Sequence, residues 1–192
     1  MRYLDNQDVD KAVAETARVL GAHDTQDWSV PAGSLEWSCW TTAAHIAHDL
    51  LAYAGQVAAR PADAYLPFDL AVRPGTAPRE VLQVVTTCAG LLSSVLATAD
   101  PGLRAWHWGP CDRSGFAAMG VAEILLHTYD ITQGLGVPWT PPAPLSTKVL
   151  HRIFPDAPPG DPAQVLLWCT GRSELDDRPR RASWSWQAAV SD

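Results

Sequence analysis

Cysteine and positive charge are the two things this sequence has little of. Its four cysteines, at positions 39, 88, 111 and 169, form no Cys-x-x-Cys pair, so neither a disulfide framework nor a cysteine zinc site is indicated. Lysine and arginine number 14 against 21 acidic residues, and the net charge of −7 argues against nucleic acid and anionic membranes as partners. The chain also shows no signal-peptide pattern, and we expect no membrane span. These absences predict a cytoplasmic protein.

The strongest structural signal in the sequence is the recurrence of apolar residues at helical spacing. With 192 residues the chain can form one domain with a substantial core. The spacing predicts four main helices, at about residues 6–21, 40–60, 76–98 and 116–134, followed by short helices near 147–154 and 163–170. The tail, residues 180–190, is expected to form a short strand or an ordered arm.

The fourth predicted helix carries polar residues in the middle of its apolar face. At ~100° per residue, Glu123, His127 and Asp130 fall on one stripe with Phe116 and Gly120. Burying these ionisable groups is costly unless they pair or bind a cation. Glu123 and His127 lie one turn apart and can converge on one point, and Gly120 is expected to leave open space beside them. The alternative is a buried hydrogen-bonded network without a metal.

The second predicted helix supplies a third candidate ligand. Relative to its apolar stripe, Asp49 lies about 60° and His45 about 100° to one side, whereas His48 lies about 160° away. His45 and Asp49 can therefore border a site that faces the core, and His48 is expected to point into solvent. His45, Glu123 and His127 are the predicted metal ligands.

Three short motifs resemble those of a known family. They are Trp37-Ser38 eight positions before His45-Ile46, Ala122-Glu123 with His127 and Asp130-Ile131, and the run Leu167–Arg172. Together they resemble the mycothiol-dependent maleylpyruvate isomerase N-terminal domain family, within the DinB-like metal-binding bundles, over roughly residues 5–172.

The resemblance favours an all-α fold. We expect an up-and-down four-helix bundle of the DinB-like kind that binds metal and spans residues 1–136. Residues 137–192 are expected to form a short C-terminal extension that packs on the bundle and is not an independent domain.

The resemblance also implies a chemistry. In the family, the positions matching His45, Glu123 and His127 hold a divalent metal, usually zinc; nickel, iron or manganese suit the same donors. Two imidazoles and a carboxylate leave open positions on zinc, as in catalytic sites. Family members use the metal to activate a small thiol, mycothiol in actinobacteria. Such a thiolate can add to an electron-poor double bond or displace a leaving group from an electrophile.

Three further residues are assigned candidate roles. Asp130 and Asp49 are candidate catalytic residues, able to orient a ligand imidazole or to take a proton. Arg172 is the candidate cofactor-binding residue because a guanidinium can hold a carboxylate bidentately; a surface salt bridge is the alternative.

The predicted function is a metal- and thiol-dependent transferase or isomerase acting on a small electrophile. Its expected partners are that electrophile and a small thiol, with no nucleic acid or membrane, and a homodimer is left open. Two other functions use the same ligands. One is a metal-dependent hydrolase that uses metal-bound water and takes Asp49 or Asp130 as its base. The other is a non-enzymatic, metal-stabilised ligand-binding module.

Overall fold

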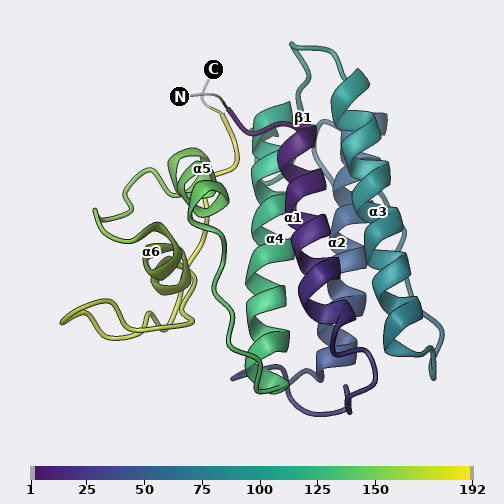
Figure 1. The fold of residues 1–192 in the computed structure, drawn as a ribbon. Helices are drawn as coiled ribbons and strands as arrows, with labels where there is room; N and C mark the ends of the chain where they lie inside the picture. The colour runs from purple at the N-terminus through teal and green to yellow at the C-terminus, as the bar shows by residue number, and fades with distance from the viewer. Residues whose placement is uncertain (1–2, 191–192) are drawn as a thin grey trace.

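The structure is a computed structural model that describes residues 3–190, and it is mostly helical (Figure 1). Four long helices lie side by side, and two shorter helices with the C-terminal segment form a layer beside α4. The elements within the described residues are α1 (Asn6–Gly21), α2 (Cys39–Ala59), α3 (Pro78–Thr98), β1 (Ala105–Trp106), β2 (Pro110–Cys111), α4 (Arg113–Gly134), α5 (Ala143–Ile153) and α6 (Pro162–Cys169).

Side-chain caps fix where most of these helices begin. Asp5, Ser38 and Asp161 accept hydrogen bonds from backbone N–H groups in the first turns of α1, α2 and α6, which satisfies donors that have no partner within the helix. These three starts agree with the predictions to within one residue, whereas α5 begins at Ala143, four residues before its predicted start near 147. The start of α4 was predicted three residues too late, because Asp112 caps it by accepting from the Gly115 N–H at 2.7 Å.

Helix α4 differs most from its prediction. The sequence suggested one apolar face, but every residue of α4 from Gly115 to Thr132 is buried except Tyr129. The reason is its position: α1 and α2 pack on one side of α4, and α5 packs on another. A polar side chain on almost any face of α4 must therefore find a partner inside the protein.

Among the described helices, α3 is the one whose length and composition would suit a membrane span, with a hydropathy of 1.7. It packs on α1 and α2, and its exposed face carries Gln83, Thr86, Thr87 and Ser94 together with Leu91, which is 47% exposed. The buried face of α3 is therefore the one that packs on the other helices, as in a core helix.

The layer beyond α4 is tied to the long helices by charged groups. Lys148 of α5 donates to both carboxylate oxygens of Asp8 in α1, at 2.7 and 2.8 Å. Arg152 of α5 donates to Asp112 at 2.8 Å, just before α4. The domain division at 136/137 stays a prediction.

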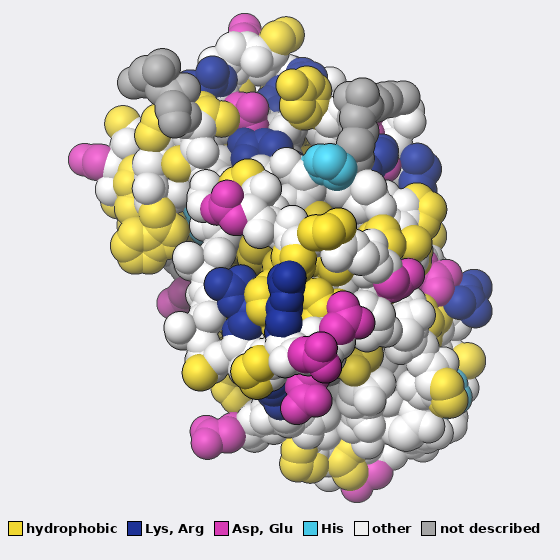
Figure 2. All heavy atoms as spheres, turned by 90° about the vertical axis from the view of Figure 1, so that its left-hand side faces the viewer, with side chains coloured by type: hydrophobic (Ala, Val, Ile, Leu, Met, Phe, Trp, Pro, Cys, Tyr) yellow, Lys and Arg dark blue, Asp and Glu magenta, His cyan; other side chains and the backbone are white. Residues whose placement is uncertain are grey.

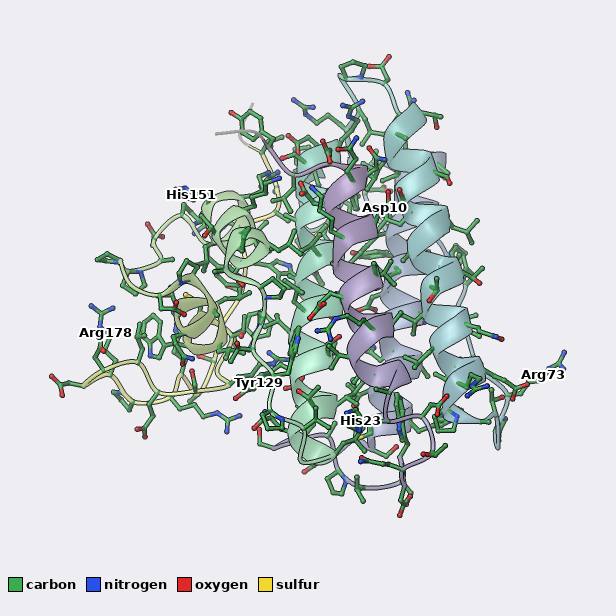
Figure 3. All side chains as sticks on the ribbon, viewed as in Figure 1. Asp10, His23, Arg73, Tyr129, His151 and Arg178 are labelled. Atoms are coloured by element: carbon green, nitrogen blue, oxygen red, sulfur yellow. The ribbon has the colours of Figure 1, made fainter. Side chains whose placement is uncertain are left out.

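The C-terminal segment forms an ordered arm without a regular strand. The Gln187 N–H donates to the Ile153 carbonyl and the Val190 N–H donates to the Pro110 carbonyl, both at 2.8 Å. Figure 2 views the molecule from the side of this layer, where hydrophobic side chains lie among groups of both charges. Figure 3 places Arg178 of this layer and Arg73 of the α2–α3 connection on opposite sides of the molecule.

Candidate metal centre

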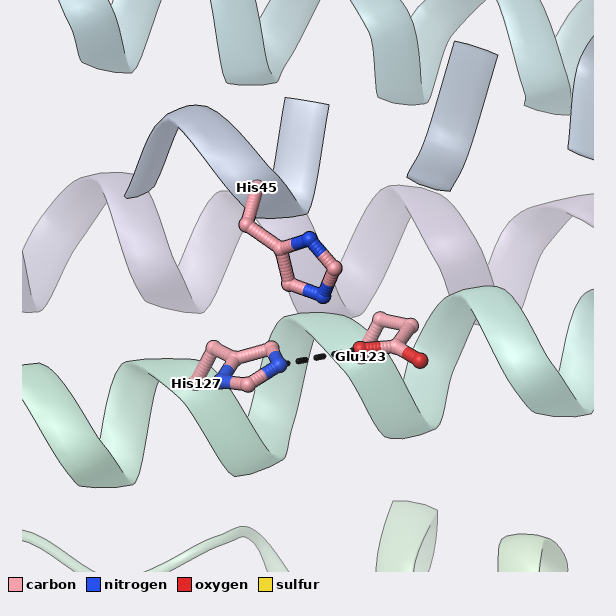
Figure 4. A group of neighbouring side chains, drawn as sticks. All are labelled: His45, Glu123 and His127. Atoms are coloured by element: carbon pink, nitrogen blue, oxygen red, sulfur yellow. Dashed lines mark ion pairs between the residues drawn. The ribbon is translucent and has the colours of Figure 1, made fainter. Parts of the chain in front are cut away.

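Helices α2 and α4 bring the three predicted ligands together. His45 projects from α2 toward Glu123 and His127 of α4 (Figure 4). One donor atom from each residue can be chosen so that all three lie within 4.8 Å of one another. Ligands of a tetrahedral zinc lie about 3.4 Å apart when the bonds are about 2.1 Å, so modest side-chain rotation would complete the set. Metal binding by these residues stays a prediction.

His127 is held at both ring nitrogens. Its Nδ1 lies 3.0 Å from Asp130 Oδ2, and its Nε2 lies 3.1 Å from Glu123 Oε2. A bond to Asp130 fixes Nδ1 as the protonated nitrogen, which leaves Nε2 as the nitrogen that can bind a metal.

Asp130 is paired in turn with Arg172. The guanidinium donates to Asp130 Oδ1 at 2.9 Å and to Oδ2 at 2.7 Å. The Arg172 side chain is 10% exposed and that of Asp130 is 4% exposed. Arg172 therefore makes a buried bidentate ion pair, where the sequence allowed a surface salt bridge. Its role in binding a cofactor stays a prediction, and three of its N–H groups are already used, two by Asp130 and one by the Thr170 carbonyl.

The candidate ligands His45, Glu123 and His127, together with Asp130, form a cluster to which α2 contributes two further side chains. Asp49 Oδ2 lies 3.2 Å from His45 Nε2, and the Tyr53 hydroxyl donates to Glu123 Oε1 at 3.4 Å. His45, Asp49 and Tyr53 are spaced four residues apart, so they form one stripe along the helix. Tyr53 was not among the predicted site residues, although the same four-residue spacing could have indicated its place beside Asp49.

Burial and the neighbouring charges set the protonation of the cluster. Burial lowers the pKa of His127, but its hydrogen bonds to Asp130 and Glu123 outweigh burial and raise that pKa to about 9. Burial and the Glu123 charge raise the pKa of Asp49 to about 8. Burial opposes ionisation of Glu123, yet the hydrogen bond and charge of His127 hold its pKa below the usual value.

A divalent cation fits this arrangement. Without a metal, the positive charge between Glu123 and Asp130 is the proton on His127. The donor atoms are carboxylate oxygens and imidazole nitrogens, which zinc and other divalent metals accept. A cation near His127 Nε2 and Glu123 would replace that proton and keep the Nδ1 bond to Asp130.

We expect metal affinity to rise with pH. The His127 pKa of about 9 lies above the ordinary value near 6.5, so in the metal-free protein its proton stabilises the fold. That contribution is complete below about pH 6.5 and is lost as the pH rises toward 9. A metal must displace the proton, so the affinity should increase up to about tenfold per pH unit until roughly pH 9. Calorimetric titration in buffers of different ionisation enthalpy should detect at least about one proton released at neutral pH; an affinity that does not change with pH would contradict this.

Two sequence expectations about neighbouring residues are wrong. His48 does not point freely into solvent: it is half-buried, and its Nδ1 accepts a hydrogen bond from the Leu70 N–H at 3.3 Å. Gly120 does not leave open space, because a Cβ atom there would lie 2.7 Å from Leu92 Cδ2. The α2–α3 connection covers His48, and Leu92 of α3 fills the gap at Gly120.

Two clefts reach the cluster. We call the first the arginine cleft; its volume is about 670 Å³ and its lining includes Trp37, His45, His127, Arg172, Arg180 and Trp184. We call the second the tryptophan cleft; its volume is about 680 Å³ and its lining includes His107, Trp108, Glu123, Trp184 and Trp186. Trp184 of the C-terminal segment lines both clefts.

Comparison with protein families shows which family the chain belongs to. The model of the mycothiol maleylpyruvate isomerase N-terminal domain matches residues 9–132. The chain belongs to this family. Within the mycothiol maleylpyruvate isomerase N-terminal domain family, the matched region holds His45, Asp49, Glu123, His127 and Asp130, whereas Arg172 and the C-terminal segment lie outside it. No curated protein and no solved structure matches the chain significantly.

Proposed function

We propose that this protein is a metal-dependent transferase or isomerase that uses a small thiol, of the mycothiol type, against a small electrophilic substrate. The observation that carries the proposal is the convergence of His45, Glu123 and His127 within 4.8 Å, where the two histidines line one cleft and Glu123 lines the other. We further propose an up-and-down four-helix bundle of the DinB-like kind, zinc as the preferred metal, and the cytoplasm as the location.

Charge balance supports an anionic co-substrate at this site. Glu123 and Asp130 carry negative charge, and Arg172 pairs with Asp130. If a divalent cation replaces the His127 proton, the cluster gains one positive charge and becomes cationic overall while Asp49 stays neutral. A bound cation lowers the pKa of a thiol that reaches it, and the resulting thiolate would restore neutrality.

The residues around the ligands have distinct proposed roles. Asp49 is the group proposed to exchange a proton with the substrate: its pKa of about 8 leaves it protonated at pH 7, where it can give a proton, and a bound cation would lower that pKa so that it can also take one. Asp130 acts as a positioning residue: it holds Nδ1 of His127, and Arg172 holds Asp130. The thiol must come from outside, since all four cysteines of the chain are buried.

The arginine cleft is the proposed entry of the thiol cofactor. His45 and His127 line it together with Arg172 and Arg180. The Arg180 guanidinium donates to the Gly171 carbonyl and to Ser34 Oγ, and it forms no ion pair with a carboxylate of residues 3–190. A cleft with such donors suits a co-substrate rich in hydroxyl, amide or carboxylate groups.

The hydrolase remains the second candidate because Asp49 lies close enough to the ligands to serve as a general base for water. The binding module is the third. Turnover of an ester or amide without any thiol would favour the hydrolase, and metal-dependent ligand binding without turnover would favour the module.

Glu123→Gln should separate folding from chemistry. The substitution nearly keeps the side-chain volume but removes a negative ligand, so some stability should be lost through weaker metal binding and recovered with excess metal. Thiol-adduct formation with a generic electrophile should stay reduced, by about tenfold or more, since the cation then carries one negative neighbour fewer.

The measurements are melting temperature and adduct formation, each with and without saturating metal. Glu174→Gln, at an exposed position, is the matched control and should behave as wild type. Full activity of Glu123→Gln once metal is restored would mean that Glu123 only tethers the ion.

A further inference from the structure

The tryptophan cleft carries an unusual concentration of exposed indole. The Trp108 side chain is 80% exposed and Trp184 is 39% exposed, and both line the cleft together with Trp186. Exposing a large aromatic surface to water is unfavourable, and exposed aromatic side chains are more frequent at binding surfaces than on the rest of a protein. These residues lie beside Glu123, a buried carboxylate of the candidate metal centre, so a ligand that covers them would lie next to that centre.

The backbone holds Trp108 outward at a conformational cost. Trp108 lies in the turn between β1 and β2 with a φ of 54°, a left-handed conformation that a bulky residue seldom adopts. This turn places His107 inside the protein, where it is 7% exposed, and leaves the adjacent Trp108 at the surface. Strain of this kind persists only where the surrounding contacts impose it.

His107 joins the turn to the other walls of the cleft. Its Nδ1 hydrogen-bonds the Tyr65 hydroxyl, and its Nε2 accepts from the Trp186 indole N–H at 3.2 Å. The Val190 N–H adds a backbone bond to Pro110. These bonds hold the rings of His107 and Trp186 in place, so this part of the cleft is preformed, which lowers the ordering cost of binding.

The lining indicates the chemistry of the occupant. It includes no lysine or arginine, so an anionic group would find no partner there. Its one carboxylate, Glu123, already lies 3.1 Å from His127 Nε2, so a cationic group would compete with an existing partner. Indole faces and edges offer stacking and edge-to-face contacts to an uncharged ring.

We propose that the tryptophan cleft binds an uncharged aromatic ring of the electrophilic substrate and presents it at the Glu123 side of the metal centre. This inference rests on the proposed function and names the substrate class for it. The thiol then enters by the arginine cleft, which His45 and His127 line, and the ring by the tryptophan cleft, which Glu123 lines.

Proton NMR of the indole N–H groups tests the proposal on the full chain, in the absence of any thiol. Nitrobenzene is the probe, and the signals of Trp108, Trp184 and Trp186 are assigned by single Trp→Phe variants. Titration should shift these three signals, and Trp108→Ala should weaken binding by roughly 3- to 10-fold, the value of one aromatic contact. Tyr3→Ala removes an aromatic side chain of similar exposure, 78%, and should leave affinity unchanged.

Several outcomes would overturn the proposal: no shift of these signals, shifts confined to other tryptophans, or tighter binding of tetramethylammonium than of nitrobenzene. The result is separable from the proposed function. Ring binding in a protein that never reacts with thiols would keep this inference and reject the proposed function. Thiol-dependent turnover of an aliphatic electrophile with no ring binding would do the reverse.

Discussion

His45→Ala should lower the affinity for zinc by on the order of 100-fold or more. The variant removes one of three protein ligands. Structural zinc sites with four protein ligands gain about 10–16 kcal/mol, so one ligand accounts for roughly 3 kcal/mol. Competition against a chromophoric chelator measures the difference. Loss of His45 should also remove the stabilisation that bound metal gives to the folded state.

His48→Ala is the matched control for that experiment. The two rings lie on the same helix with centroids 6.3 Å apart, yet only His45 belongs to the cluster. His48→Ala should keep wild-type metal affinity and lose about 1 kcal/mol of stability, because the Leu70 N–H loses its acceptor. Loss of metal from the His48 variant instead of the His45 variant would contradict the assignment.

Arg172→Met should destabilise the protein by about 3–5 kcal/mol. The substitution keeps much of the aliphatic volume but removes the bidentate partner of the buried Asp130 carboxylate, which then keeps only its contact with His127, and removing one partner of a buried ion pair costs this much. Chemical denaturation of the metal-free protein measures the change without a contribution from metal binding.

A double variant distinguishes the lost ion pair from lost packing. Asp130→Asn removes the charge and keeps an oxygen that can accept from His127 Nδ1. Arg172→Met combined with Asp130→Asn should therefore recover most of the stability. A single Arg172 variant within about 0.5 kcal/mol of wild type, the range of ordinary surface substitutions, would show that the pair contributes little.

The helices, and the Glu123–His127 pair of the candidate site, could be predicted from local patterns. Asp5, Ser38 and Asp161 are capping residues, and apolar residues recur at helical spacing after each of them. The four-residue spacing of Glu123 and His127 is also a local property of one helix. Such features depend on neighbours within one or two turns, so the sequence contains them directly.

The remaining features depend on contacts between distant segments. Arg172 reaches Asp130 across 42 residues, and no spacing rule indicates that pairing. Helical geometry placed His48 on the outer face of α2, but it could not show that residue 70 would cover it. The burial of α4 on nearly all sides likewise follows from the packing of α5, which no pattern within α4 reveals.

The central claim is that a thiol approaches a divalent metal held by His45, Glu123 and His127, and cobalt substitution tests it most directly. Cobalt(II) added to the metal-free protein should bind at about one equivalent, and adding mycothiol should produce a thiolate-to-cobalt charge-transfer band in the near ultraviolet. The cysteines of the chain are buried and should not produce it. The account predicts the band with mycothiol and none with its S-methylated form; cobalt binding without a band, or no cobalt binding, would contradict it.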